Sequence, residues 1–341
     1  MEAKNKNISF VPIKKENNYR TLIIIFLISL GLVVTFCLSL SIGSVSLSLD
    51  EIYQALWHKG ETLNQVIVWD LRLPRILAAF IVGAALGTSG ALLQGMLRNS
   101  LATPFLLGIS AGAGLVVVVL ITLDLFLFMI PLASWLGAIL TTALVYFLAR
   151  QDNNINVERL ILGGVAVSSL FGAIQTTLLL LSEDGRIQKA LNWIVGSLNG
   201  RGWAELRLAG PYIIITLIIA CLLARYVNVL NLGDELAVSL GIPLGRSRLF
   251  IGGTATLLAA SAVSIAGLIG FVGLLVPHSM RFLLKSNDYR LLIPLSAVGG
   301  AIVLTWADLL SRIGAVELPV GAVTALVGSP LFVWLLYRRS F

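Results

Sequence analysis

Apolar stretches separated by short polar segments fill most of the chain. Most of these stretches reach the roughly 20 residues that a helix needs to span a bilayer. The predicted spans are residues 21–43, 75–97, 104–123, 130–149, 157–181, 205–226, 248–270, 271–285, 291–310 and 319–337. The seventh and eighth spans share one nearly unbroken run, so hydropathy alone also permits nine or eleven spans. The pattern predicts an all-α polytopic membrane protein with about ten transmembrane helices.

Composition agrees with a membrane protein and excludes an ordinary soluble domain. Hydrophobic residues make up 57% of the 341 residues, charged residues only 12%, and the mean hydropathy is +0.94. The net charge is +7, but the cations sit at predicted helix ends and in short loops, which disfavours nucleic acid as a partner. Cys37 and Cys221 lie inside apolar runs, where we expect small buried residues and no disulfide framework.

The distribution of lysine and arginine orients the predicted spans. With the N-terminus inside and ten spans, sixteen cations fall on the inner side and eight on the outer side. This bias predicts that both termini are cytoplasmic. Residues 1–20 are predicted to be a basic cytoplasmic tail, and residues 21–341 a single transmembrane domain. The apolar run from Leu22 to Leu40 is long for a signal-peptide core, so we interpret it as a retained first span.

Two segments on the outer side are predicted to fold locally. Within residues 46–59, Ser48 lies three residues before Glu51, which is the pattern of a capping box at the start of a short helix. Residues 183–199 combine glycines with an amphipathic stretch from Ile187 to Leu198. This stretch predicts a short interfacial helix across a pore mouth.

The inner loop, residues 233–246, carries another local pattern. Asp234 and Glu235 suit the first turn of a helix, where the helix dipole favours acidic side chains. Gly241 suits a left-handed helix end, and Pro243 then begins a second element. We expect two short helices joined by glycine, forming either a docking knob for a cytoplasmic subunit or an ordinary connector.

The segment Arg72-Leu-Pro-Arg75 lies at the entrance of the second predicted span. Two cations flank a proline there, and a charge at the mouth of a membrane helix is costly unless it is used. Gly83 and Gly87 follow four residues apart, and small residues at this spacing let membrane helices approach closely. The segment predicts a tightly packed bundle with a positive rim.

Several motifs, in this order, resemble one transporter family. They are Arg72-Leu-Pro-Arg75, the stretch 94–114 with its Arg98-Asn-Ser-Leu101 turn, the glycine-rich stretch 267–278, and Glu317-Leu-Pro-Val-Gly321. Together they resemble the FecCD-type permeases of ABC importers, and the resemblance runs from about residue 20 to the C-terminus. That family takes up iron–siderophores, haem and cobalamin.

The resemblance implies the type II ABC importer permease fold, with a dimer around a central pathway. It implies a multi-pass protein of the bacterial cytoplasmic membrane that imports an iron–siderophore complex or, alternatively, cobalamin or haem, without a cofactor of its own. The implied partners are a second permease subunit in a homo- or heterodimer, two cytoplasmic ATPase subunits, an extracytoplasmic substrate-binding protein and the lipid bilayer.

The resemblance also assigns roles to residues. Docking of the binding protein falls on Arg72, Arg75 and Arg312, since a planar guanidinium pairs with a carboxylate through two hydrogen bonds. Headgroup anchoring is the alternative for these cations. Arg312 has a rival partner in Asp308, four residues earlier. Coupling to the ATPase falls on Gly233, Asp234, Glu235, Ala237, Gly241 and Pro243.

A cytoplasmic gate falls on Asn99 and Leu101, where leucine could seal the inner mouth by excluding water. A plain tight turn ahead of Pro104 is the alternative. No metal site is predicted, because no second histidine or acid lies at ligand spacing from His278, and His58 lies in an outer loop.

Two other function classes fit the sequence less well. An ion-coupled secondary transporter usually keeps charged residues at mid-membrane depth, whereas the acids here fall in loops or near span ends. An intramembrane enzyme needs a paired nucleophile and base, or metal ligands, inside the bundle. The chain has no GxxxxGK(S/T) phosphate loop, so we expect a transport subunit whose ATP hydrolysis takes place in partner subunits.

Overall fold

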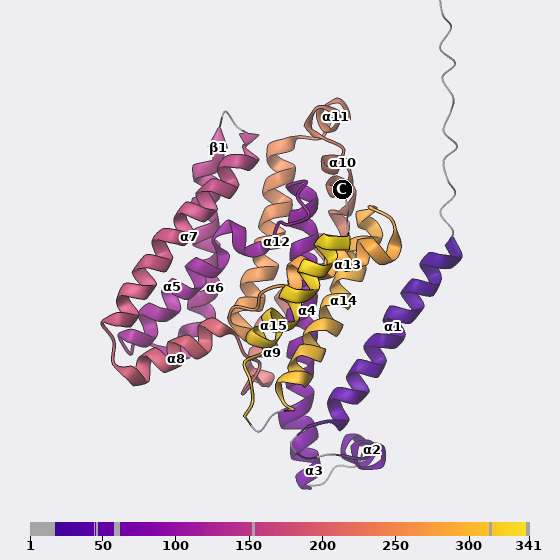
Figure 1. Ribbon diagram of the computed structural model, residues 1–341, viewed down its shortest axis with the longest axis vertical. Helices are drawn as coiled ribbons and strands as arrows, with labels where there is room; N and C mark the ends of the chain where they lie inside the picture. The colour runs from indigo at the N-terminus through magenta and orange to yellow at the C-terminus, as the bar shows by residue number, and fades with distance from the viewer. Residues whose placement is uncertain are drawn as a thin grey trace, which may run out of the picture.

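The computed structural model describes residues 18–43, 45, 47–57, 62–151, 154–313 and 316–338. Most of its long helices run side by side and form a bundle (Figure 1). Residues 1–17 of the tail predicted for residues 1–20 lie outside the described residues. His58 also lies outside them. The elements are α1 (Asn18–Ser41), α2 (Leu49–Trp57), α3 (Leu63–Gln65), the π-helix η1 (Val66–Arg72), α4 (Leu73–Met96), the 3₁₀-helix η2 (Pro104–Leu107), α5 (Ile109–Thr122), the 3₁₀-helix η3 (Leu127–Met129), α6 (Ile130–Ala149), β1 (Arg150–Gln151), β2 (Asn154–Ile155), α7 (Val157–Leu180), α8 (Asp184–Val195), α9 (Trp203–Leu222), α10 (Ala224–Asn231), α11 (Asp234–Ser239), α12 (Leu244–Ala266), α13 (Val272–Leu284), α14 (Tyr289–Ser311) and α15 (Val320–Arg338).

The described helices confirm an all-α polytopic architecture. Seven are long and apolar enough to span a membrane, and three shorter apolar helices, within α5, α13 and α15, have 10–17 residues. The count of about ten spans stays a prediction, because the shorter helices fall below the roughly 20 residues of a full span. Within the described residues, β structure is limited to the antiparallel pair β1–β2.

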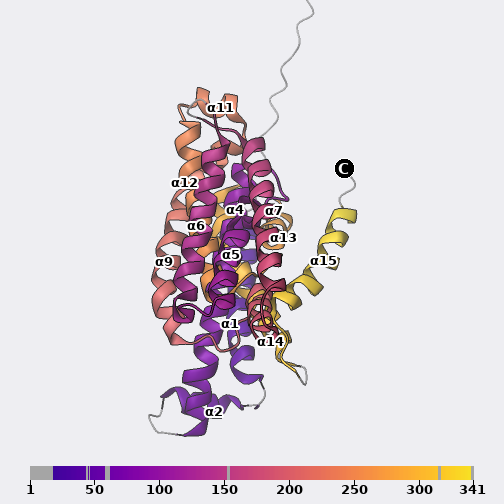
Figure 2. The ribbon, with the colours of Figure 1, turned by 90° about the vertical axis from the view of Figure 1, so that its left-hand side faces the viewer.

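The ends of the described chain lie on one side of the bundle. Helix α1 begins and α15 ends in the half that carries α11, whereas α2 and α3 lie at the opposite end (Figures 1 and 2). This arrangement agrees with the predicted topology, in which both termini share a side with residues 233–246. Which side faces the cytoplasm stays a prediction.

Helix α4 lies at the centre of the bundle. In the continuous helix Leu63–Met96, to which α4 belongs, 83% of an apolar stretch of 18 residues is buried. A Cβ atom at Gly83 would lie 2.2 Å from the carbonyl oxygen of Gly300, and one at Gly87 would lie 2.3 Å from that of Ser296. Both partners belong to α14, so the two helices touch backbone to backbone. The structure thus confirms the close approach predicted from small residues four apart.

The outer end of α4 differs from the prediction. Helical backbone begins at Leu63 and passes through η1 into α4, so the helix that carries the second predicted span begins well before residue 75. Arg72 therefore lies inside a continuous helix. Pro74 accounts for the π-helical turns, because a proline ring clashes with the carbonyl group four residues earlier in a regular α-helix, and a wider turn relieves the clash.

The two locally folded outer segments are both helical. At the start of α2, the N–H and hydroxyl of Ser48 donate to Glu51 Oε2 at 2.7 and 2.9 Å, and the Glu51 N–H donates to Ser48 Oγ at 3.3 Å. The backbone hydrogen bond from Ser48, and then its hydroxyl, lower the pKa of Glu51. This capping box is therefore complete at neutral pH and is lost as the pH falls through the lowered value. The expected amphipathic helix is α8.

The inner loop forms one short helix, not two. Gly241 takes the predicted left-handed conformation at the end of α11, with φ +78°. The Gly241 N–H donates to the Val238 carbonyl and the Ile242 N–H to the Ala237 carbonyl, both at 2.9 Å, which is a Schellman ending. After Pro243 the long helix α12 begins at once. The prediction of a second short helix was wrong, because α12 continues without a break from Leu244, through Gly245, to Ala266.

The prediction that Cys37 and Cys221 are buried was also wrong, since both are exposed on the described bundle. They lie on α1 and α9, two of the helices that could span the membrane. An apolar run does not separate a core position from a lipid-facing one, because both surroundings are apolar.

Gly83→Ala should destabilise the bundle, because its new methyl group meets a backbone oxygen that cannot move aside. We expect a loss of roughly 1–3 kcal/mol, the usual range for overpacking. Gly172→Ala in α7 is the matched control, since nothing lies within 4 Å of its added Cβ. Thermal unfolding in detergent, followed by tryptophan fluorescence, should show a lower midpoint for Gly83→Ala alone. Equal midpoints would contradict the backbone contact.

Candidate functional site

Two groups of charged residues mark opposite ends of the bundle. At the end away from α11, the three arginines predicted to dock a partner, Arg72, Arg75 and Arg312, line one cavity of ≈ 450 Å³. Arg201 lines the same cavity, and Asp70 is the one acidic residue among its described lining residues. We call this cavity the outer cavity, after the predicted topology, and its described lining carries more positive than negative charge.

Arg72 is held by backbone carbonyl groups. Its guanidinium donates to the carbonyls of Leu40 and Ser41 at the end of α1 and of Val45 in the segment after it, and the side chain is buried. Gly43 makes room for it, since a Cβ there would lie 2.8 Å from Arg72 Nη2. Carbonyl oxygens partly offset the cost of burying the charge, and they fasten the end of α1 to η1.

Arg75 and Arg312 share one buried carboxylate. Arg75 Nε donates to both oxygens of Asp308, at 3.0 and 3.2 Å, and its Nη2 donates to Oδ1 at 2.8 Å. Arg75 also forms an ion pair with Glu317, and Arg312 forms one with Asp308, as its spacing predicted. The Asp308 side chain is fully buried. This network joins α4, α14 and the segment before α15.

The docking role of the three arginines stays a prediction. Each guanidinium already has a partner inside the chain, so a carboxylate from another protein would compete with these bonds. Asp308 was visible from the sequence as a neighbour of Arg312 on the same helix. The sequence analysis missed Glu317 as a partner of Arg75 and Arg201 as a neighbour in the same cavity, because no local spacing connects them to residues 72–75.

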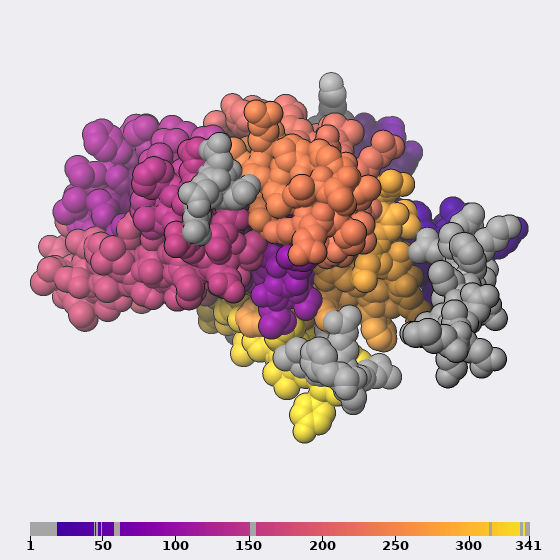
Figure 3. Space-filling model, turned by 90° about the horizontal axis from the view of Figure 1, so that it is seen from above, coloured from indigo at the N-terminus to yellow at the C-terminus, as the bar shows by residue number. Residues whose placement is uncertain are grey.

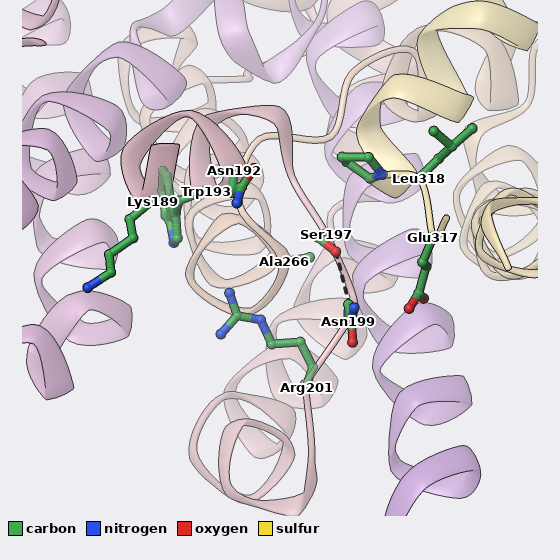
Figure 4. A pocket seen from close by; sticks show the side chains of 10 residues that line it. Lys189, Asn192, Trp193, Ser197, Asn199, Arg201, Ala266, Glu317 and Leu318 are labelled. Carbon is green, nitrogen blue, oxygen red and sulfur yellow. Dashed lines mark hydrogen bonds between the residues drawn. The ribbon is translucent and has the colours of Figure 1, made fainter. Parts of the chain in front are cut away.

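A second cavity, of ≈ 390 Å³, lies beside the first. It is lined by Lys189, Asn192, Trp193, Ser197, Asn199, Arg201, Ala266, Glu317, Leu318 and Pro319 (Figure 4). Asn199 and Arg201 belong to the walls of both cavities. We call this second cavity the α8 cavity, because α8 supplies three of its lining residues.

Three glycines shape the backbone around the α8 cavity. A Cβ at Gly196 would lie 2.4 Å from the Leu268 carbonyl oxygen, one at Gly267 would lie 2.3 Å from the Trp193 carbonyl oxygen, and one at Gly321 would lie 1.8 Å from that of Val195. Gly196 and Gly267 also have positive φ angles, +79° and +72°. The end of α8, the end of α12 and the start of α15 therefore meet here, which explains why two of the family motifs contain these glycines.

At the opposite end, Asp234 connects α11 to two other parts of the chain. Arg248 Nη2 on α12 donates to both carboxylate oxygens of Asp234 at 2.8 Å, and Arg98 lies 3.5 Å from it. Arg248 is buried and also donates to the carbonyl of Ile155 at 3.0 Å. Asp234 was predicted as a residue of the first helical turn. Its contacts with Arg248 and Arg98, which we call the Asp234 clamp, appear only in the tertiary structure.

The predicted gate residues lie in the turn that follows α4. Asn99 Oδ1 accepts the N–H of Leu101 at 2.9 Å, which closes a tight turn, and the Leu101 side chain is 49% exposed. The preceding residue is Arg98, which reaches Asp234. Seen from this end, the purple surface of the segment after α4 lies beside the orange surface of α11 and α12 (Figure 3). The structure therefore brings the predicted gate and the predicted coupling helix together.

Helix α11 and its C-cap residue Leu240 present apolar side chains outward. Leu236, Val238 and Leu240 are 55%, 57% and 62% exposed, whereas Ala237 is fully buried against the bundle. Glu235 is exposed beside them. An exposed apolar patch at the tip of a polar loop is typical of a protein interaction surface.

A further polar network holds the inner part of α4. Arg281 on α13 donates to Gln94 Oε1 at 2.6 Å and to the Tyr289 hydroxyl at 3.2 Å. The Gln94 amide donates to the carbonyls of Gly273 and Leu274. No local pattern in the sequence points to this network, because Gln94 and Arg281 are 187 positions apart.

Among the described residues, no group of three or more histidine, cysteine, aspartate or glutamate side chains could hold a metal ion. His278 is buried in α13.

The chain matches the FecCD transport family over residues 31–338. It is 37% identical over 327 residues to the hemin transport system permease protein HmuU of Yersinia pestis, covering 93% of this chain and 94% of that one. It is 37% identical to the Fe(3+)-citrate import system permease protein YfmE of Bacillus subtilis, covering 93% of this chain and 95% of the other.

A solved structure described as an inward-facing conformation of a putative metal-chelate type ABC transporter superimposes with a TM-score of 0.85 at 31% identity, covering 93% of this chain and 99% of that one. Matches of this extent and identity establish the fold as that of an ABC importer permease. The chain therefore belongs to the FecCD transport family.

Proposed function

We propose that this chain is the permease subunit of an ATP-driven importer that moves an iron–siderophore complex into the cytoplasm. The observation that supports it best is the two-ended arrangement of a multi-pass bundle. One end carries cation-lined cavities, and the other carries a helix with exposed apolar residues fixed beside a tight turn. A substrate received at the first end and an ATPase docked at the second fit this arrangement.

Haem and cobalamin are the alternative substrates. Relatives named for hemin, cobalamin, Fe(3+)-citrate and iron(3+)-hydroxamate import match the chain at 35–40% identity. Three of the matching Bacillus subtilis permeases are named for ferric citrate or ferric hydroxamate, and two relatives from other organisms are named for cobalamin or vitamin B12.

In this proposal the partners are a second permease subunit, two cytoplasmic ATPase subunits and an extracytoplasmic binding protein, and both termini are cytoplasmic. The α11 surface docks the ATPase, and Asn99 and Leu101 form the inner gate. Because Arg98 and Arg248 both hold Asp234, a movement of α11 reaches the gate turn and α12 together.

Reconstitution tests the function directly. The permease with its ATPase and binding protein in proteoliposomes should accumulate a labelled ferric chelate only when ATP is present on the ATPase side. A proton or sodium gradient without ATP should drive no uptake. Uptake driven by the ion gradient alone would instead support a secondary transporter.

Asp234→Asn should uncouple transport from ATP hydrolysis. The substitution removes the charge that Arg248 and Arg98 hold, and hydrogen bonds to charged groups contribute about 1.5–3 kcal/mol. We expect the ATPase to remain bound through the apolar α11 surface, while stimulation of ATP hydrolysis by the loaded binding protein falls severalfold. Glu158→Gln, an exposed acid at the start of α7, is the control. If Asp234→Asn retains full stimulation, the clamp plays no part in coupling.

Charge changes at Arg75 and at its partner Glu317 should alter docking of the binding protein. Glu317→Gln removes a carboxylate that occupies Arg75, so it should strengthen docking, whereas Arg75→Gln should weaken it. An ion pair formed at the cavity rim with the binding protein would contribute roughly 0.2–1 kcal/mol, which corresponds to at most about fivefold in affinity. The measurement is affinity for the permease complex in nanodiscs at low salt and at 1 M salt, where the Debye length of about 3 Å should abolish the differences.

Glu183→Gln is the control for the docking experiment, because it removes an equally negative side chain that is 81% exposed and lines neither cavity. The same increase in affinity for Glu183→Gln and Glu317→Gln would assign the effect to net charge and return the arginines to headgroup anchoring or to a purely structural role.

A further inference from the structure

The α8 cavity contains two cations that have no hydrogen-bonded carboxylate partner among the described residues. Lys189 forms no hydrogen bond or ion pair with any described residue. The Nε atom of Arg201 is buried and has no hydrogen-bond partner among the described residues. Both side chains line the cavity, Lys189 from α8 and Arg201 from the connection to α9 (Figure 4).

Arg201 has one loose ion pair, with Glu205 four residues later, and no tight carboxylate partner within the described part of the chain. Glu205 Oε2 accepts the N–H of Gly202 at 3.0 Å as part of the cap of α9, and its other oxygen is 3.7 Å from Arg201 Nη1, beyond hydrogen-bond distance. Glu317, the one acidic residue in the described lining, forms its ion pair with Arg75. The α8 cavity therefore has a net positive wall.

Neutral side chains add donors to this wall. Asn192 Oδ1 accepts a hydrogen bond from Gln188 at 3.2 Å, which leaves its amide nitrogen available. Ser197 Oγ accepts the N–H of Asn199 at 3.1 Å, so its own proton can be donated to a ligand. Donors without acceptors around two cations match the chemistry of an anionic oxygen ligand.

The remaining wall suits the body of a compact ligand. Trp193 and Pro319 contribute apolar surface, and ≈ 390 Å³ falls within the range of about 300–1,000 Å³ for small-molecule sites. The closely packed glycines Gly196, Gly267 and Gly321 hold the backbone behind this wall rigidly. A site preorganised in this way binds without the cost of ordering loops.

We propose that the α8 cavity is an anion subsite that takes a carboxylate group of a negatively charged ferric chelate, with Arg201 and Lys189 as its charged contacts. The assignment rests on the proposed function, and it adds a selectivity for anionic over neutral chelates. Arg201 also lines the outer cavity, so the ligand's charge is met by the same guanidinium on entry from that side.

The test measures binding of two chelates to the complete permease–ATPase complex in nanodiscs, with the binding protein omitted. One chelate is ferric citrate, which is anionic, and the other is a ferric trihydroxamate, which is neutral. We expect ferric citrate to bind more tightly. Arg201→Gln should weaken its binding by about tenfold, equivalent to about 1.4 kcal/mol, and leave the trihydroxamate unchanged.

Three further variants separate charge from structure. Lys189→Gln should weaken the binding of ferric citrate by only about two- to threefold, because the Lys189 ammonium is exposed and hydrated. Arg201→Lys should retain more binding than Arg201→Gln. Arg207→Gln, which removes an exposed cation of α9 outside both cavities, should change nothing. Gel filtration of each complex checks that it is folded.

Equal binding of the two chelates by the wild type, including no measurable binding of either, would overturn the subsite. An equal loss for both chelates in Arg201→Gln, or the same loss in Arg207→Gln, would also overturn it. ATP-driven uptake by the complete importer is measured in parallel. Uptake without charge selectivity disproves the subsite alone, whereas charge-selective binding without any ATP-driven uptake disproves the proposed function.

Discussion

The direct backbone contact between α4 and α14 is the constraint on which the other features depend. At Gly83 and Gly300 the two helices are so close that neither position accepts a methyl group. In lipid, such contact provides the packing that the hydrophobic effect cannot supply between apolar helices. It also brings Arg75 of α4 within 2.8 Å of Asp308 of α14, where the pair is shielded from water and therefore interacts strongly.

Buried charge is costly in a membrane protein, and this chain offsets it in two ways. Backbone carbonyls at the end of α1 surround Arg72, and carboxylates hold Arg75, Arg312 and Arg248. Against this background the α8 cavity is unusual, because Arg201 has only a loose ion pair and the neighbouring carboxylates are bound elsewhere. Its positive charge is thus more readily explained by a ligand than by the stability of the fold.

Helix α12 connects the two ends physically. It starts beside α11, carries Arg248 on its second turn, and ends at Ala266, which lines the α8 cavity. Gly267 then turns the chain against the Trp193 carbonyl. A stiff helix with fixed contacts at both ends therefore joins the α11 end of the bundle to the wall of the α8 cavity.

The sequence by itself determined the membrane class, the helical architecture, the α2 capping box, the left-handed Gly241 and the close approach at Gly83 and Gly87, because hydropathy, capping and small-residue spacing are local properties. It did not determine that Arg72 lies within a continuous helix or that the cysteines are exposed. Only the tertiary structure joined Asp308 to Arg75 and placed Arg201 between two cavities. Those relations link residues far apart in the chain, and only the packing of α4, α8, α12 and α14 sets the distances between them.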